Sequence, residues 1–149
     1  MLSVKKEKVK SMKVKVMLDA GAKMPEKAHT ADAGYDLFGR DFCIISPGSS
    51  AVLDTGVHVQ IPDGYVGFLQ SKSGLNVNHS ITSEGVIDSG YTGSIRVKLY
   101  NNGKDMYQFF PGDKLSQIVF LKCEDFELVE ADGLEETERG NNGFGSSGR

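Results

Sequence analysis

The feature that most constrains the fold is the recurrence of turn-forming tripeptides between short segments of β-like pattern. Turn residues stand together at 46–48 (Ser-Pro-Gly), 62–64 (Pro-Asp-Gly) and 111–113 (Pro-Gly-Asp). Proline presets φ for a turn, aspartate caps it through its side chain, and glycine accepts the left-handed conformation. The segments between these turns alternate apolar and polar residues or are apolar for a few positions, which is typical of strands. Closely spaced turns and short strands predict an all-β sandwich, barrel or jelly roll rather than a parallel α/β fold.

The same pattern predicts where the individual elements lie. We expect strands at residues 13–18, 42–45, 51–61, 65–69, 95–100, 107–110, 115–121 and 126–129. Gly56 interrupts the third of these segments and predicts a β-bulge there. Residues 71–83 are too polar for a core strand, and one or two helical turns are expected near 74–77. The connection at 19–33 has no sustained periodicity, and long connections in compact domains often carry function.

Length and charge place this pattern in one domain with two tails. At 149 residues the chain can bury a sound core without a second domain. We divide it into a basic arm at 1–12, a β domain at 13–138 and a flexible Gly-rich tail at 139–149. Lysines near the amino end could suggest a nucleic-acid partner, but at 13–16 they alternate with valines, as on the solvated face of a strand. We therefore expect no nucleic-acid partner.

The apolar residues and the cysteines indicate the compartment. The sequence has no secretory signal and no apolar run of the ~18 residues that span a bilayer. Cys43 and Cys123 lie among apolar residues without the spacing of a metal site, so we expect two buried free thiols. His29, His58 and His79 also lack metal-ligand spacing, and His58 is expected at the surface of its strand. These features predict a cytoplasmic protein without a membrane partner.

Residues 85–93 (Gly-Val-Ile-Asp-Ser-Gly-Tyr-Thr-Gly) carry a carboxylate and an aromatic ring on a glycine-bounded turn. Asp88 in such a turn is most often a turn acid, because its side chain stabilises the turn through hydrogen bonds to the backbone. The alternative is a general base fixed at the rim of a pocket, with Tyr91 beside it. No Ser-His-Asp or Cys-His arrangement suggests covalent catalysis. The residues alone leave both explanations of Asp88 open.

Two segments have the composition of a phosphate site. Residues 71–74 (Ser-Lys-Ser-Gly) offer a cation, two hydroxyls and a glycine amide just before the expected helical turn. The tail offers Arg139, two serines and several glycine amides. Neither segment matches a P-loop or a Rossmann fingerprint. Phe144 has glycine on both sides, and such a ring indicates a segment that closes over a flat ligand rather than a plain spacer.

Five short segments, taken in their order and spacing, are similar to the motifs of one enzyme family. They are 33–37 (AGYDL), 71–75 (SKSGL), 85–93 (GVIDSGYTG), 111–117 (PGDKLSQ) and 139–148 (RGNNGFGSSG). On these segments the chain resembles the homotrimeric deoxyuridine triphosphate nucleotidohydrolases, or dUTPases, from about residue 13 to the end. The resemblance implies a jelly-roll-like β domain that forms a homotrimer, with active sites between subunits and a Gly-rich C-terminal lid. It also implies hydrolysis of dUTP to dUMP and pyrophosphate by attack of water on the α-phosphorus, which limits uracil incorporation into DNA and supplies dUMP for dTMP synthesis.

The resemblance assigns roles to residues of these segments. Asp88 is the catalytic base that activates the water, and Tyr91 packs against the deoxyribose and leaves no room for a 2′-hydroxyl. Asp36 holds a water on a Mg²⁺ ion that the triphosphate chelates, so Mg²⁺ is the expected cofactor. Phe144 stacks on uracil when the tail closes over dUTP in the site of a neighbouring subunit. The remaining predicted substrate-binding residues are Lys72, Ser73, Gly74 and Gln117 for the phosphates, Thr82, Gly85, Val86 and Ile87 in or beside a uracil-reading hairpin at 78–86, and Arg139, Gly145, Ser146 and Ser147 in the tail.

The match has departures and rivals. Lys72 and Lys114 stand where relatives often carry arginine, and lysine keeps the charge but loses the bidentate fork. Gly90 stands where an acid is common, and Thr82 stands where some relatives have asparagine. A dCTP deaminase on a similar fold is the rival enzyme, but it needs an acid beside the cytosine amino group, and the hairpin offers only Glu84. The rival from another class is a nucleotide-binding switch protein with little turnover.

Overall fold

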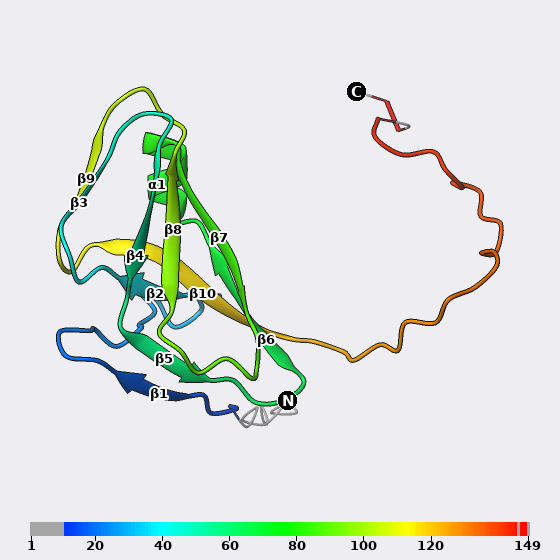
Figure 1. Ribbon diagram of the computed structural model, residues 1–149, viewed down its shortest axis with the longest axis horizontal. Coiled ribbons are helices and arrows are strands. Elements are labelled where there is room, and N and C mark those ends of the chain that lie inside the picture. The colour runs from blue at the N-terminus through cyan, green and yellow to red at the C-terminus, as the bar shows by residue number, and fades with distance from the viewer. Residues whose placement is uncertain (1–10, 146, 149) are drawn as a thin grey trace, which may run out of the picture.

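The structure is a computed structural model that describes residues 11–145 and 147–148. These residues form ten strands and one short helix, and most of the strands belong to one curled sheet (Figure 1). In chain order the elements are β1 (Lys15–Leu18), β2 (Tyr35–Phe38), β3 (Cys43–Ile45), β4 (Ser50–Asp54), β5 (Val57–Gln60), β6 (Tyr65–Gln70), α1 (Ser73–His79), β7 (Ile81–Ile87), β8 (Arg96–Asn101), β9 (Tyr107–Phe109) and β10 (Lys114–Lys122).

A six-stranded sheet forms the centre of the domain, in the order β2-β10-β6-β7-β8-β4. Two ribbons of two strands flank it: β1-β5 lies at the lower end of the view in Figure 1, and β3-β9 lies at the upper left. The pairings between these strands are antiparallel. The curled sheet and its two ribbons make a jelly-roll-like half-barrel, which confirms the predicted all-β fold class.

The core lies on the inner face of the curled sheet because the strands alternate as the sequence predicts. In β8, Val97 and Leu99 are buried, whereas Arg96 and Lys98 are exposed. The buried pair joins an apolar cluster that includes the fully buried ring of Phe109. Each side chain buried in this way contributes about 1.5–3 kcal/mol, so the alternation supplies much of the stability of the domain.

Two glycines take the backbone conformations that the turn chemistry predicts. Gly64 has φ 81°, and the turn around it is closed by a hydrogen bond of 3.2 Å from the Tyr65 amide to the Pro62 carbonyl. Gly56 has φ 65° at the point where the chain leaves β4 in the central sheet and enters β5 in a ribbon. Asp54 Oδ1 accepts a hydrogen bond of 2.8 Å from the Gly56 amide. The predicted interruption at Gly56 is therefore a corner between two sheets.

Residues 71–83 differ from the expectation for a polar segment. Helix α1 has about two turns, as predicted, and it ends at His79, followed by the C-cap residue Ser80 with φ 55°. β7 begins at Ile81, and both Ile81 and Ser83 are buried, so the expectation that this segment contains no core strand is wrong for its last residues. Residues 78–86 also do not form the predicted hairpin. They comprise the end of α1 and most of the single strand β7. In the described part of the chain, no helix has the length and apolar character needed to cross a membrane.

The C-terminal part of the chain also differs. Residues 126–129 do not form the predicted strand, and Phe126, Leu128 and Val129 are exposed. Their local pattern favours a strand, but beyond β10 the chain leaves the domain and meets no sheet edge in Figure 1. Cys123, just after β10, is exposed rather than buried, and Cys43 is only partly buried.

Candidate active site

A charged cluster lies where β2, β10 and the end of β6 meet. Asp36 in β2 is 2 % exposed, and its two carboxylate oxygens face two lysines. Lys72 Nζ lies 2.5 Å from Oδ1, and Lys114 Nζ, at the start of β10, lies 2.8 Å from Oδ2. Sheet pairing explains the meeting, because Gln117 of β10 pairs with Asp36 on one side and Gln70 on the other. The cluster carries one negative and two positive charges, which suits an anionic ligand.

The electrostatics of the cluster keep Asp36 ionised. Burial by itself would raise the pKa of Asp36, but the contacts with Lys114 and Lys72 outweigh it and lower the pKa below the ordinary 3.8. The Asp36 carboxylate in turn raises the pKa of Lys114. The buried Oδ2 atom of Asp36 forms an ion pair with Lys114 but accepts no further hydrogen bond. One acceptor position at this oxygen is therefore open.

Replacing Asp36 by asparagine is expected to destabilise the fold at neutral pH. The substitution leaves Lys72 and Lys114 facing each other without their shared counter-charge, and a loss of about 1–3 kcal/mol is expected because both lysines are partly exposed. The Asp36 pKa is lowered in the folded state, so its contribution is present above pH 3.8 and disappears as the pH falls through the folded value. Urea unfolding of the wild type and the variant at neutral and acid pH measures this difference. The exposed turn acid Asp63 offers the control Asp63→Asn, and an equal loss in both variants would contradict the assignment.

Gln117 lies beside this cluster and depends on a glycine in the first motif. Its Nε2 donates a hydrogen bond of 3.1 Å to the Ser71 carbonyl. A Cβ on Gly34 would lie 2.3 Å from Gln117 Oε1, so only glycine at position 34 leaves room for this amide. Gln117 is partly buried rather than the plain solvent-facing residue that its strand position alone would suggest. The structure thus brings the segments around 34, 71 and 117 together.

Buried serines support the cluster from below. Ser83 Oγ and Ser116 Oγ lie 2.8 Å apart, and Ser116 Oγ donates to the Gln70 carbonyl at 2.9 Å. The Ser71 hydroxyl both accepts from the Ser83 amide and donates to its carbonyl. These contacts tie β6, β7 and β10 together directly under the charges. Because the buried hydroxyls are hydrogen-bonded, the network makes the position of the cluster rigid.

Ser73 and Gly74 begin helix α1 next to this cluster. Lys72 is the N-cap residue, and no side chain caps the helix. The first amides of a helix have no intrahelical acceptor, so those of Ser73 and Gly74 can meet an anion placed at Lys72. The space around Gly74 is open, with no atom within 4 Å of a Cβ built there.

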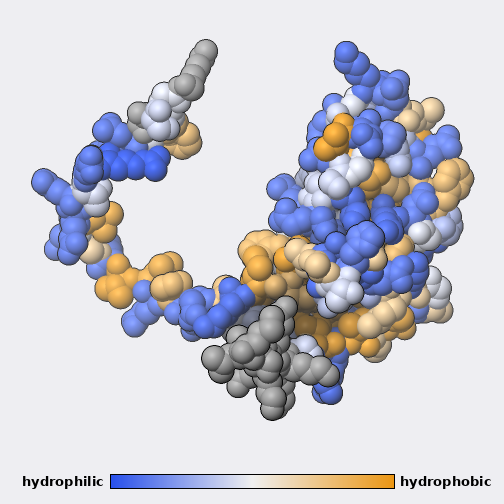
Figure 2. Space-filling model, turned by 180° about the vertical axis from the view of Figure 1, so that it is seen from behind, coloured by the Kyte–Doolittle hydropathy of each residue, from blue (hydrophilic) through white to orange (hydrophobic). Residues whose placement is uncertain are grey.

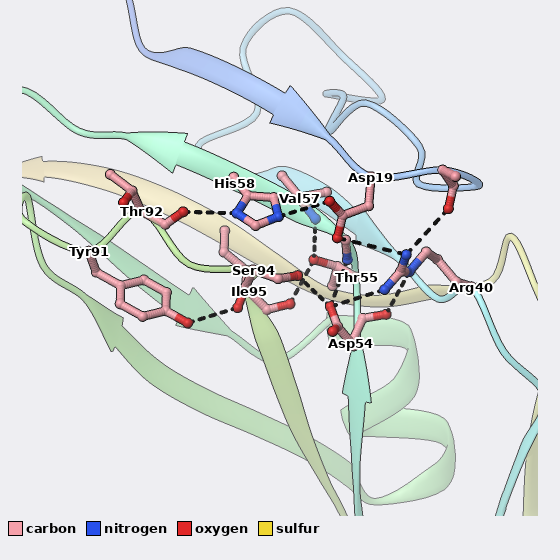
Figure 3. A network of polar contacts seen from close by, with 12 residues as sticks. Asp19, Arg40, Asp54, Thr55, Val57, His58, Tyr91, Thr92, Ser94 and Ile95 are labelled. Carbon is pink, nitrogen blue, oxygen red and sulfur yellow. Dashed lines mark hydrogen bonds and ion pairs between the residues drawn. The ribbon is translucent and has the colours of Figure 1, made fainter.

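The turn that carries Asp88 and Tyr91 follows β7 directly. It is closed by a hydrogen bond of 3.0 Å from the Tyr91 amide to the Asp88 carbonyl, so Asp88 is structurally a turn residue, as its local sequence suggests. The Tyr91 hydroxyl donates to the Ser94 carbonyl at 2.9 Å, and the ring is 41 % exposed (Figure 3). A Cβ on Gly93 would lie 2.5 Å from the Tyr91 hydroxyl oxygen, so the ring folds back over a position that only glycine keeps free. The turn therefore exposes Asp88 three residues before a ring that is held in place.

The predicted base-reading residues all lie on β7. Val86 is exposed and Ile87 is buried, so their side chains point to opposite faces of the sheet. Gly85 lies against Leu69, where a Cβ would come within 3.1 Å of the leucine side chain. Thr82 Oγ1 accepts a hydrogen bond of 3.2 Å from Asn102 Nδ2. The pairing of β7 with β8 ends at Ser83, whereas β6 pairs with β7 from Glu84 to Ile87. Near the exposed Val86, backbone groups on one side of β7 are therefore available, and Glu84 is the exposed polar side chain on the same face.

The two halves of the candidate site are separated within one chain. β6 and β7 run antiparallel, with Gln70 opposite Glu84 and Gly67 opposite Ile87. Lys72 follows one end of this pair and Asp88 follows the other. At about 3.3 Å per residue, the distance along the strands is on the order of 15 Å. The structure therefore brings Asp36, Lys72 and Gln117 together and keeps Asp88 and Tyr91 apart from them.

The predicted tail residues lie far from both halves. The chain after β10 runs away from the domain in an extended path (Figure 1). Arg139 Nε donates to the Asn142 carbonyl at 2.8 Å, and the Phe144 ring is fully exposed. Gly145 has φ 96°, and Ser147 is exposed. The predicted residue Ser146 lies outside the described residues.

Sequence reasoning missed Lys114 as a site residue. It was noted as a departure from the family pattern, yet its ammonium group is one of the two that neutralise Asp36. The signal was present, because Lys114 belongs to the same short motif as Gln117. Ser116 belongs to that motif too, but Ser83 lies in none of the five, and the contact between the two serines spans 33 residues.

Comparison with known proteins identifies the class of this site. The family model described as dUTPase matches residues 20–148. A deoxyuridine 5′-triphosphate nucleotidohydrolase of Tropheryma whipplei is 40% identical over 144 residues, covering 93% of this chain and 97% of the relative. The structure of a Staphylococcus bacteriophage 80alpha dUTPase with dUPNHPP has a TM-score of 0.87 and 31% identity, covering 93% of this chain and 100% of that one. A mutant dUTPase from phage phi11 of S. aureus, described with a structural Mg(II) ion, has a TM-score of 0.77 and 31% identity over 84% of this chain and 100% of its own.

These matches define an all-β nucleotide hydrolase. The chain belongs to the dUTPase family, whose enzymes hydrolyse deoxyuridine triphosphate. Both the resemblance drawn from the five motifs and the predicted jelly-roll-like fold are thereby confirmed.

Proposed function

We propose that this protein hydrolyses dUTP to dUMP and pyrophosphate by attack of water on the α-phosphorus, with Asp88 as the general base. The observation that carries this proposal is the turn after β7, which holds Asp88 and Tyr91 in one fixed arrangement through the Tyr91 amide and hydroxyl. Asp88 accepts the proton of the attacking water, and the pyrophosphate leaves from the opposite side of the phosphorus. Hydrolysis at the α-phosphorus requires a base that activates water, and selectivity for a deoxynucleotide requires a group beside the sugar. Asp88 and Tyr91 provide these two functions in the proposal.

Tyr91 acts in this proposal as the sugar filter. Its hydroxyl bond to the Ser94 carbonyl and its contact with Gly93 hold the ring in one orientation. A deoxyribose can pack flat against such a ring, whereas a 2′-hydroxyl would meet it without a hydrogen-bond partner. The backbone of β7 near Val86, beyond the end of its pairing with β8 at Ser83, is the proposed uracil reader, because alternating amide and carbonyl groups can match the donors and acceptors on the edge of the base.

The charged cluster is the proposed phosphate site. A triphosphate carries roughly four negative charges, and preorganised cations and amides offset the repulsion they exert on an incoming nucleophile. Lys72 and Lys114 are held in place by Asp36 and can turn toward phosphate oxygens. Gln117 and the first amides of α1 at Ser73 and Gly74 add neutral donors next to them.

Mg²⁺ fits this site when the triphosphate supplies most of its ligands. Among residues 11–145 and 147–148, no three His, Cys, Asp or Glu side chains are grouped so that they could hold a metal ion. Asp36 nevertheless has a buried oxygen with an open acceptor position, which suits a water carried by the ion. A bound Mg²⁺ would neutralise phosphate charge and polarise the reacting group. The Mg(II) ion of the phage phi11 relative is described as structural in that protein.

A homotrimer with shared sites resolves the separation between the two halves. When the α-phosphorus of dUTP lies at Asp88 of one subunit, the charged cluster around Lys72 of a second subunit can bind its phosphates. The acidic segment after β10 supports the same assembly, because Leu128 and Leu134 are 95% and 93% exposed in the isolated chain. Large apolar side chains of this kind mark a contact with a partner, and Figure 2 shows apolar residues along this segment outside the domain. The tail at 139–149 then closes over a neighbour's site, with Phe144 stacked on uracil and Arg139, Gly145, Ser146 and Ser147 near the phosphates.

A substrate panel tests the proposed function. The protein is incubated with dUTP, dCTP, dTTP and UTP, with and without Mg²⁺, and the release of pyrophosphate and ammonia is measured. Pyrophosphate is expected from dUTP with Mg²⁺, and dUTP is expected to be preferred over UTP by roughly 10²-fold or more because of Tyr91. Ammonia from dCTP would contradict the proposal in favour of a deaminase. Tight dUTP binding without turnover would contradict it in favour of a nucleotide-binding switch.

A further inference from the structure

A polar network connects the turn after β7 to the corner between β4 and β5 and to the end of β1 (Figure 3). Thr92 and Ser94 of the turn segment each contact a side chain of that corner. Ser94 Oγ donates to Asp54 Oδ1, and the Thr92 carbonyl lies 2.8 Å from His58 Nδ1. Asp19, just after β1, lies 3.2 Å from His58 Nε2 through its Oδ1 atom. The segment that carries Tyr91 is therefore attached to elements outside the proposed site.

The geometry of His58 requires a particular protonation state. One ring nitrogen faces a carbonyl oxygen and the other faces a carboxylate oxygen, and both of these groups only accept hydrogen bonds. A neutral imidazole has a single N–H. In that form, the lone pair of the other ring nitrogen would face an oxygen lone pair, and one of the two contacts would not be a hydrogen bond. Only the imidazolium donates to both Thr92 and Asp19. The two contacts are complete in the protonated form alone.

The charges around His58 favour that form. Asp19 faces it from the end of β1 and Asp54 lies farther off at the end of β4, while Arg40 lies 3.9 Å from the other Asp19 oxygen. The hydrogen bond to the Thr92 carbonyl and then the bond to Asp19 raise the pKa of His58 above the ordinary 6.5. Both contacts are therefore complete below pH 6.5, and one of them is lost as the pH rises through the folded value.

The remaining contacts of the corner do not depend on this proton. Thr55 Oγ1 donates to the Ile95 carbonyl at 2.7 Å, and the Ile95 amide donates to the Val57 carbonyl at 2.8 Å. Arg40 Nη2 lies 3.4 Å from Asp54 Oδ1 and holds that acid against the corner. These bonds fix the end of the turn segment at residues 94 and 95. Loss of the His58 contact thus affects the part nearer to Tyr91 and leaves the entry into β8 in place.

We propose that His58 is a positioning residue for dUTP binding: its imidazolium clamps the Thr92 carbonyl to Asp19, and release of this clamp at alkaline pH loosens Tyr91. The inference rests on the proposed role of Tyr91 beside the deoxyribose. Thr92 directly follows Tyr91, so the backbone held by His58 is the backbone that sets the direction of the ring. The consequence is a pH-dependent KM for dUTP and a pH-dependent preference over UTP.

The first test needs no nucleotide. The ring carbons of tyrosine and the ring nitrogens of histidine are labelled in the full chain, and their NMR signals are followed with pH. Tyr91→Phe and His58→Asn assign the two rings. The Tyr91 signals are expected to shift with the midpoint of His58, and Asp19→Asn is expected to lower both midpoints together. Tyr91 signals that stay constant through the His58 titration would overturn the inference.

The second test is kinetic. His58→Asn keeps a donor for the Thr92 carbonyl but has no charge, so it resembles the deprotonated state. The KM for dUTP is expected to be about three- to tenfold higher in this variant than in the wild type near pH 6, the usual net effect of one hydrogen bond, and equal near pH 9. The control His29→Asn, which removes an exposed imidazole from the connection before β2, is expected to follow the wild type at both pH values.

The outcomes separate this inference from the proposed function. A constant KM ratio between His58→Asn and the wild type across the pH range would overturn the role of His58 while dUTP hydrolysis stands. A protein that does not hydrolyse dUTP would refute the proposed function, and the coupling between His58 and Tyr91 would still be decided by the NMR titration.

Discussion

Asp88→Asn is expected to lower kcat for dUTP hydrolysis by about 10²- to 10⁴-fold, the usual contribution of a positioned general base. The turn itself should survive the substitution, because the hydrogen bond that closes it uses the backbone carbonyl of Asp88 rather than its carboxylate. Tyr91 keeps its bond to the Ser94 carbonyl for the same reason. Nucleotide binding should therefore change little while the proton acceptor for the attacking water is lost.

Single-turnover kinetics and calorimetric binding of a nonhydrolysable dUTP analogue separate these two effects. The matched control is Asp63→Asn, which removes the carboxylate of an exposed turn acid between β5 and β6 and should leave both kcat and binding unchanged. Unchanged turnover in Asp88→Asn would remove Asp88 from the proposed mechanism. Loss of binding together with turnover would show that Asp88 holds the nucleotide rather than the water.

Local chemistry predicted the parts of the fold that depend on few neighbours. The turn at Gly64 and the corner at Gly56 follow from the residues that stand there, and the alternation of Val97 and Leu99 with lysine and arginine is visible in the sequence. β7 was harder to predict because Ser83 looks like a surface residue. It can be buried because Ser116 of β10 provides a hydrogen-bond partner for its hydroxyl, and Ser71, just after β6, accepts from its amide.

The opposite error occurred after β10. Phe126 and Val129 have the composition of a strand, but a strand needs an edge to pair with, and the isolated chain offers none there. Their pattern is therefore local evidence for a structure that one chain cannot complete. The exposed apolar residues of this segment are explained if a second copy of the chain provides the missing contact.

In the site, too, contacts between residues close in sequence could be predicted, whereas contacts between distant residues could not. Asp88 and Tyr91 lie three residues apart, so their joint presentation could be predicted from the turn alone. The contact of Asp36 with Lys72 spans 36 residues and depends on the order of strands in the sheet. The contact of His58 with Asp19 spans 39 residues within one ribbon, and its contact with Thr92 spans 34 residues and joins that ribbon to the turn. No motif marks either His58 or Asp19.

Deleting residues 139–149 is expected to reduce dUTP hydrolysis on the order of 10²-fold without unfolding the domain. Residues 139–145, 147 and 148 are exposed, and the hydrogen bonds from Arg139 to the Asn142 carbonyl and from the Gly140 amide to Thr137 are local, so the deletion should leave the core of the β domain intact. The loss arises because the open site keeps water around the phosphates and lacks the Phe144 ring over the base. Phe144→Ala should show part of the effect in KM. Thermal unfolding and solution mass are expected to match the full chain, and a fully active truncation would contradict the lid.

Mixing two inactive variants decides which subunit provides the tail. Asp88→Asn subunits have an intact tail, and truncated subunits have an intact Asp88. If the tail closes over a neighbour's site, mixed trimers contain sites with both parts, and activity should reappear after the two proteins are unfolded, combined and refolded. The control mixture pairs Asp88→Asn with a truncated Asp88→Asn chain, which cannot assemble a complete site in any arrangement. Because the chain after β10 runs away from the domain (Figure 1) and the Phe144 ring is fully exposed, recovery is the expected result. A mixture as inactive as its control would place each tail on the site of its own subunit.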